Sequence, residues 1–173
     1  MLVSKTIRLR LVEESDAGFI VSVRSNEKYN RYLSVVRSDV EVQRQWIKDY
    51  KEREQNRQEF YFIIERNDDG SRCGTVRVYD LKEDSFCWGS WILNENKTRY
   101  SALESALLVY EFGFDKLGFN KSHFEVLKDN SKVVDFHLKF GANKVGEDDE
   151  YFYYEIDRNS VASTKNKFTR IIK

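Results

Sequence analysis

Two side chains in the stretch FEVLKDNSKVVDFHLKFGA, residues 124–142, could carry acid–base chemistry. Glu125 stands near the end of a strand-like segment, and His137 follows twelve positions later in a helix-like segment. A carboxylate can accept a proton, and an imidazole can donate one near neutral pH. The pair could therefore act as general base and general acid. The alternative is a surface carboxylate and a core histidine hydrogen-bonded to the backbone, which is the commoner situation for a lone histidine.

A second candidate is the strand, connector and helix of residues 86–117. The N-terminus of a helix that follows a strand presents free N–H groups and the positive end of a dipole, which suits a phosphate. Lys97 and Arg99 add positive charge there, but the connector lacks the glycines of a dedicated phosphate loop. An ordinary β–α connection is the alternative. Glu104 could be a catalytic carboxylate, yet its place in the capping box that Ser101 opens favours a structural role.

The pattern of apolar residues predicts the elements that position these groups. It indicates an antiparallel meander followed by β–α–β, whose crossover makes the two flanking strands parallel. We therefore expect an α/β fold, with a mixed, mostly antiparallel sheet and helices on both faces. The predicted strands are 5–13, 59–65, 73–81, 85–93, 122–128 and 150–156. Helices are predicted after Ser15, after capping boxes that begin at Ser38 and at Ser101, and from the DNS motif to Phe140.

Composition narrows the class of protein. The chain of 173 residues favours one domain, which we place at 1–157, with a polar and poorly ordered tail at 158–173. Its 29 basic and 29 acidic residues balance, so we expect neither nucleic acid nor a membrane as partner. Two cysteines outside a C-x-x-C motif and the lack of a signal-like segment predict a cytoplasmic protein with reduced thiols. Two histidines argue against a His-rich metal site, and we expect no metal.

Three segments resemble one known family. WGSWIL with its polar connector is similar to the family's pantetheine-binding strand, and KTRYSALESALLVYEFGFDKLGFNK to the helix after its pyrophosphate loop. FEVLKDNSKVVDFHLKFGA is similar to its E-V-x-x-x-N…L-Y-E-K-x-G-F block. The chain thus resembles, over nearly its whole length, the GCN5-related N-acetyltransferases (GNAT), in the branch that acetylates ribosomal-protein N-termini or amino-sugar nucleotides. This resemblance implies six to seven strands, with a central parallel pair that splays apart.

The resemblance also implies roles for individual residues. Acetyl-CoA would be the co-substrate, and a backbone N–H at Ile92 or Leu93 would polarise its thioester. Glu125 matches the general base of some members, and His137 stands where many have a tyrosine that protonates the leaving thiolate. Asn130 would contact the cofactor or order the start of its helix. The implied pantetheine contacts are the backbone of Trp91, Ile92 and Leu93, and the implied pyrophosphate contacts are the N–H groups of Arg99, Tyr100, Ser101 and Ala102.

The implied reaction is direct attack of a primary amine on the thioester. The aromatic segment 25–34 would shape the acceptor side, and stacking would suit a small amine such as a nucleotide-linked amino sugar. A protein N-terminus as acceptor and a catalytically silent binding module are the alternatives. The protein is expected to be a monomer or a homodimer.

Overall fold

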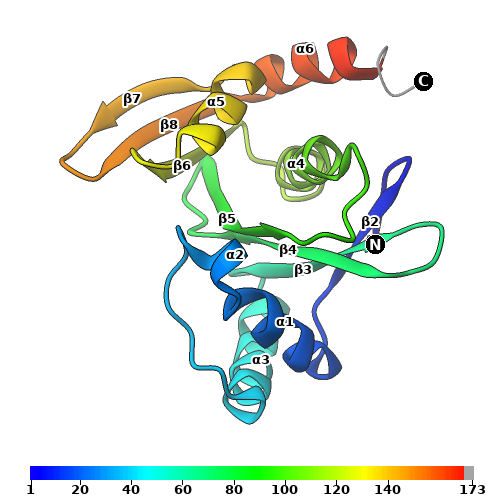
Figure 1. The fold of residues 1–173 in the computed structure, drawn as a ribbon. Helices are drawn as coiled ribbons and strands as arrows, with labels where there is room; N and C mark the ends of the chain where they lie inside the picture. The colour runs from blue at the N-terminus through cyan, green and yellow to red at the C-terminus, as the bar shows by residue number, and fades with distance from the viewer. Residues whose placement is uncertain (170–173) are drawn as a thin grey trace.

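The computed structural model describes residues 1–169. One sheet of eight strands, in the order β1-β2-β3-β4-β5-β6-β8-β7, runs through the molecule (Figure 1). The predicted mixed sheet is confirmed, with one or two strands more than expected. The strands are β1 (Leu2–Val3), β2 (Ile7–Leu11), β3 (Phe60–Arg66), β4 (Arg72–Tyr79), β5 (Ser85–Leu93), β6 (Lys121–Leu127), β7 (Asn143–Glu147) and β8 (Tyr151–Asp157).

Helices cover both faces of this sheet, as expected. On one face α1 and α3 enclose a small core, and on the other α4 and α5 enclose a larger one (Figure 1). A 3-10 turn at Glu14–Asp16 precedes α1, and a π-helical turn at Phe112–Lys116 extends α4. The helices are α1 (Ala17–Arg24), α2 (Glu27–Asn30), α3 (Val40–Gln55), α4 (Ser101–Glu111), α5 (Ser131–Phe140) and α6 (Arg158–Thr169).

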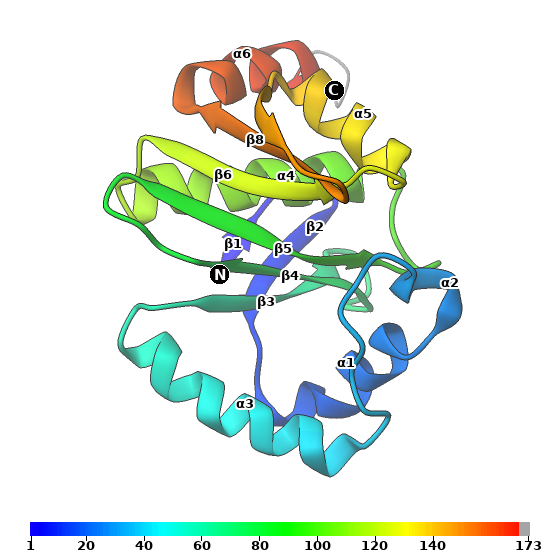
Figure 2. The same ribbon diagram turned by 90° about the vertical axis from the view of Figure 1, so that its left-hand side faces the viewer.

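The parallel pair β5 and β6 is joined at one end only. Ser85 pairs with Lys121 and Phe86 with Ser122, and the ladder stops there. Figure 2 shows the two strands parting beyond this point. The parted stretch of β5 is also irregular, since its register with β4 shifts and Ser90 has a φ of +48°. The β4-facing edge of β5 is therefore paired, while its β6-facing edge is open over most of its length.

Two C-terminal elements differ from the expectations. Strand β7 was not predicted, because its sequence NKVGE is polar and almost fully exposed at the sheet edge. The tail was expected to be poorly ordered, which is wrong for residues 158–169. These residues form α6, which buries Val161 and Thr164 and packs Phe168 near Phe140, with ring centroids 6.4 Å apart. Residues 170–173 lie outside the described part, and the domain boundary at residue 157 stays a prediction.

Two predicted capping boxes are also wrong. Helix α3 is capped by Asp39 rather than Ser38, since the Asp39 carboxylate accepts from the amides of Glu41 and Val42. Helix α4 has Tyr100 at its N-cap position and no side-chain cap. None of the helices within residues 1–169 is both long enough and apolar enough to cross a bilayer.

Candidate active site

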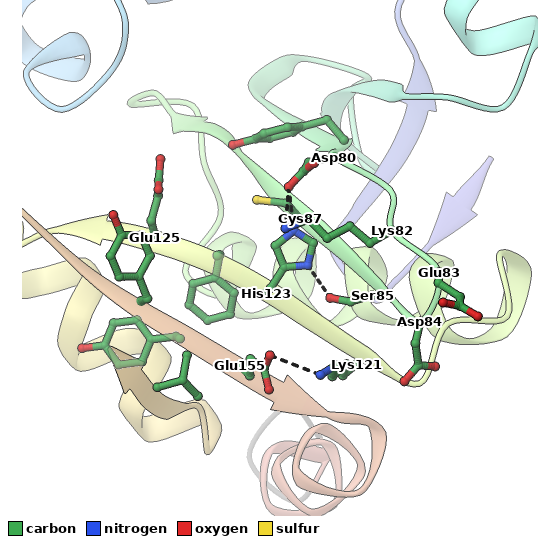
Figure 3. A pocket seen from close by; sticks show the side chains of 15 residues that line it. Asp80, Lys82, Glu83, Asp84, Ser85, Cys87, Lys121, His123, Glu125 and Glu155 are labelled. Carbon is green, nitrogen blue, oxygen red and sulfur yellow. Dashed lines mark hydrogen bonds and ion pairs between the residues drawn. The ribbon is translucent and has the colours of Figure 1, made fainter. Parts of the chain in front are cut away.

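A cavity of about 570 Å³ lies on the sheet face opposite α4, beside the junction of β5 and β6 (Figure 3). Side chains from the end of β4, from the connection between β4 and β5, and from β5, β6, β7 and β8 form its walls. Five carboxylates line it against two lysines and one histidine, so its charge is acidic overall. The charged lining residues are Asp80, Lys82, Glu83, Asp84, Lys121, His123, Glu125 and Glu155.

Glu125 belongs to this cavity. It alternates along β6 with the buried Phe124 and Val126, so its exposed side chain stands on the face opposite α4. The salt bridges formed within residues 1–169 do not include Glu125, whereas the neighbouring Glu155 pairs with Lys121 at 3.2 Å. Glu125 is therefore available to take a proton from a group bound in the cavity.

A hydrogen-bonded chain stands beside Glu125 on the same face. The Nε2–H of His123 donates to the carboxylate of Asp80 at 2.8 Å, because a carboxylate can only accept. Nδ1 of His123 is also hydrogen-bonded to the hydroxyl of Ser85. The bond from His123 holds the pKa of Asp80 below its usual value. These hydrogen bonds link the end of β4 to β5 and β6 at the point from which the strands part (Figure 3).

His137 lies on the other face of the sheet. Its ring packs against Phe124 of β6 and Trp88 of β5, with centroid distances of 4.1 Å and 5.4 Å, so it bridges the parted strands from the α5 side. The expected backbone hydrogen bond of a core histidine is missing at Nδ1, which has no partner in the described part of the chain. Burial lowers the pKa of His137 to about 3. The imidazole is therefore neutral at neutral pH and has no imidazolium proton to donate.

The open edge of β5 supplies backbone groups to the gap. The amide of Asn94 donates to the carbonyl of Cys73 at 2.9 Å, so at position 94 the N–H points toward β4. Peptide groups alternate along a strand, so the N–H of Ile92 points the same way and that of Leu93 points into the gap. Trp91 is held by its indole N–H, which donates to Ser105 Oγ of α4 at 3.1 Å. Leu93, rather than Ile92, can thus offer its N–H to a bound carbonyl.

The start of α4 offers further donors. Thr98 N donates to Ser101 Oγ at 2.8 Å, and Ser101 N donates to Thr98 O at 3.3 Å, so the Ser101 amide is already engaged. Within residues 1–169, the amides of Arg99, Tyr100 and Ala102 have no hydrogen-bond acceptor. Tyr100 and Ala102 stand at the N-cap and in the first turn of α4, where the helix itself offers no partner. Three of the four predicted pyrophosphate donors are thus available, which fits an anionic group even without a glycine loop.

Glu104 is not part of this site. It is fully buried, and its carboxylate accepts from the hydroxyl of Ser4 at 2.8 Å and from the amide of Thr6 at 2.8 Å. It also accepts from the hydroxyl of Thr6. Its role is to tie the N-terminal strands to α4, which confirms the structural alternative although the capping box is absent.

Asn130 and the segment 25–34 meet near the end of β6. Asn130 is the N-cap residue of α5, where its carbonyl accepts from the amides of Val133 and Val134 and its side chain makes no capping bond. The hydroxyl of Tyr32 donates to the carbonyl of Asp129 at 3.1 Å. The segment 25–34 is thereby held beside the turn between β6 and α5, and its role in shaping the acceptor side stays a prediction.

The sequence did not reveal Asp80 and Ser85 as partners of His123. These residues are far from position 123 in the chain, and only the shared face of His123 and Glu125 on β6 was a signal. Asp80 also has a φ of +48°, a strained conformation that an aspartate tolerates better than most residues and that often marks functional positions.

Comparisons with known proteins agree with this arrangement. Residues 6–143 match the acetyltransferase (GNAT) domain family. The solved structure of apo FdhC, a nucleotide-linked sugar GNAT, is 55% identical with a TM-score of 0.92, over 99% of this chain and 98% of that one. The Probable N-acetyltransferase YjcK of Bacillus subtilis (strain 168) is 27% identical over 155 residues, 84% of this chain and 85% of that protein.

A more distant structure shares the fold alone. The ribosomal-protein-S5-alanine acetyltransferase of Vibrio fischeri superposes with a TM-score of 0.78 at 14% identity, over 91% of this chain and 96% of that one. The family match spans most of the chain, and the parted parallel strands are the feature of the fold that the resemblance predicted. The chain therefore belongs to the GNAT family of N-acetyltransferases and is an acyltransferase.

Proposed function

We propose that this enzyme transfers the acetyl group of acetyl-CoA to the amine of a nucleotide-linked amino sugar. The observation that carries the proposal is the likeness to FdhC, a nucleotide-linked sugar GNAT, at 55% identity over 99% of the chain. The acidic cavity beside the parted strands supports the amine as acceptor, since its carboxylates attract a cationic ammonium group. A cytoplasmic location and a monomeric or homodimeric state belong to the same proposal.

Acetyl-CoA would lie where β5 and β6 part. Its pantetheine arm would pair with the open edge of β5 at Trp91 and Leu93, as an added strand does. The free amides at Arg99, Tyr100 and Ala102 would hold the pyrophosphate, helped by the positive end of the α4 dipole. Asn130 stands at the start of α5 on the other side of the gap and would contact the cofactor or order that helix.

Glu125 would be the general base. A primary amine is protonated at neutral pH and must lose a proton before it can attack a carbonyl carbon. Glu125 would take this proton, directly or through water. The N–H of Leu93 would then donate to the thioester oxygen as negative charge grows on it.

His137 would act at the leaving sulfur, but as a neutral ring. With a pKa near 3 it has no imidazolium proton at neutral pH. The unpartnered Nδ1 can, as the N–H tautomer, donate a hydrogen bond toward a thiolate in the gap. In this proposal His137 stabilises the departing thiolate, and the proton released by the amine reaches the sulfur through solvent.

A thermal-shift experiment with acetyl-CoA tests the cofactor half of the proposal. At a concentration about a hundred times the Kd, a ligand that binds only the folded state stabilises it by about 2.7 kcal/mol. We expect such a gain, reduced by the double substitution Lys97→Glu and Arg99→Glu. The matched control is Lys82→Glu in the acidic cavity, which should retain the full gain. No gain at saturating ligand would contradict acetyl-CoA binding and favour a silent module.

An acceptor screen tests the other half. Free CoA release would be followed with an amino-sugar nucleotide, the same amino sugar without its nucleotide, and a peptide with a free N-terminus. We expect turnover to be fastest with the amino-sugar nucleotide. Faster turnover of the peptide would replace the proposed acceptor with a protein N-terminus.

A further inference from the structure

A second cavity, of about 140 Å³, lies on the same face of the sheet as the acidic one, under α1 and α3. It is lined by two arginines, one on α1 and one on β4, together with polar and aromatic side chains. The lining residues are Arg24, Ser34, Val36, Gln43, Trp46, Tyr61 and Arg77. No carboxylate is among them.

Three polar atoms of this lining are buried without a partner. Nε of Arg24, Nε of Arg77 and the hydroxyl of Tyr61 have no hydrogen bond in the part of the chain that the structure describes. Arg24 is only 8% exposed and Tyr61 only 1%. A buried donor left unsatisfied costs free energy, and such groups are rare in folded proteins. Three of them around one cavity indicate a ligand that accepts hydrogen bonds.

The charge around this cavity is positive. Arg24 donates through Nη2 to the carbonyl and hydroxyl of Ser34, both neutral, and no ion pair with Arg24 is present within residues 1–169. Arg77 pairs with Glu59 at 2.8 Å, but that carboxylate is shared with Arg53 at 3.2 Å. The two guanidinium groups that line the cavity thus have only a shared part of one carboxylate between them, so an anion is favoured.

The two cavities meet at Arg77 and Tyr79. These side chains follow one another on the same face of β4, and the guanidinium of Arg77 lies 5.1 Å from the ring centroid of Tyr79. Arg77 lines the basic cavity and Tyr79 lines the acidic one. A ligand that lies across Arg77 and Tyr79 would find carboxylates at one end and arginines at the other.

We propose that the basic cavity binds a phosphoryl group of the acceptor, so that Arg24, Tyr61 and Arg77 hold the diphosphate while the amine lies near Glu125. The inference rests on the proposed function, because it takes the acceptor to be nucleotide-linked. It explains how an acidic cavity can serve a substrate that carries negative charge. The phosphates occupy a separate, positively charged place.

Direct binding measurements test the site without any turnover. Isothermal titration would compare uridine diphosphate, thymidine diphosphate and inorganic pyrophosphate on the wild type and on three variants. Arg24→Met and Arg77→Gln should each weaken nucleoside diphosphate binding about tenfold or more, since each removes a charged hydrogen bond. Arg53→Gln, which shares Glu59 but does not line the cavity, is the matched control and should bind within about twofold of the wild type.

Tyr61→Phe keeps the test decisive if an arginine variant fails to fold. It removes only a hydroxyl without a partner, so the melting temperature of the free protein should stay the same or rise. Binding of the diphosphates should still weaken severalfold, because the ligand loses a donor. A Tyr61→Phe variant that binds all three probes as tightly as the wild type does would overturn the proposal.

The outcomes separate the site from the proposed function. If an amino-sugar nucleotide is acetylated while the variants bind diphosphates normally, the function stands and the site is overturned. If diphosphates bind through these residues but no nucleotide-linked amine is acetylated, the site stands and the acceptor assignment fails. Pyrophosphate binding as tight as that of the nucleoside diphosphates would assign the cavity to the phosphoryl groups alone. Tighter nucleoside diphosphate binding would show that the nucleoside contributes as well.

Discussion

The ring of His137 lies 4.1 Å, centroid to centroid, from the ring of Phe124, on the opposite side of β6 from Glu125. The two groups that first suggested an acid–base pair therefore lie on opposite faces of the sheet. In the proposed mechanism both would act on a substrate held in the gap between β5 and β6, each from its own face of the sheet.

The burial of His137 predicts a pH dependence of stability. Its pKa falls from 6.5 to about 3 on folding, so between these values the unfolded chain binds the proton and the folded chain does not. The full stability is present above about pH 6.5 and is lost progressively toward pH 3, by at most about 1.4 kcal/mol per pH unit. The free energy of unfolding, measured in urea at a series of pH values, should change less steeply with pH in His137→Phe than in the wild type. Identical slopes would contradict this assignment.

Glu125→Gln should reduce turnover of the competent amine by about 10²- to 10⁴-fold, the range expected for losing a general base. The stability gained with acetyl-CoA should be unchanged, because Glu125 lies on the acceptor side. Glu155→Gln is the matched control, since it removes a carboxylate of the same cavity that already pairs with Lys121. Equal activity of the two variants would remove Glu125 from the mechanism.

Glu104→Gln should destabilise the fold by about 1–3 kcal/mol, because the buried carboxylate accepts from Ser4 and Thr6 and an amide cannot accept at both ends. The free energy of unfolding in urea measures this. Glu111→Gln on the same helix is half-exposed, with its partner Lys165 at 3.6 Å, and should change stability by less than about 0.5 kcal/mol. A Glu104 variant as stable as the Glu111 variant would be the contrary result.

Gly113→Ala should also lower stability, by about 1–3 kcal/mol. A Cβ at this position would lie 2.1 Å from the ring of Phe86, which is fully buried. Gly18→Ala is the control, since no atom lies within 4 Å of its Cβ and alanine favours the helix by roughly 0.5–1 kcal/mol. Thermal unfolding should move in opposite directions for the two variants.

Much of the fold was accessible from sequence patterns. Alternating apolar residues placed β2, β3, β4, β6 and β8, and the β–α–β order required one parallel pair. The elements that were not predicted, β7 and α6, are polar and lie at the periphery. They bury few side chains, so their sequences show little apolar periodicity. The spacing of Val161, Thr164 and Phe168 in α6 was the available signal.

The sequence by itself determined the order of elements, the family resemblance, and the face of β6 on which Glu125 stands, because these depend on local periodicity and on residue identity. Only the tertiary structure decided that His137 is neutral, that Leu93 rather than Ile92 turns its N–H to the gap, and that Arg24 and Arg77 share a cavity. The pKa of a buried group, the edge of a strand to which each N–H points, and the residues that share a cavity all depend on neighbours distant in the chain. Such neighbours exist only after folding.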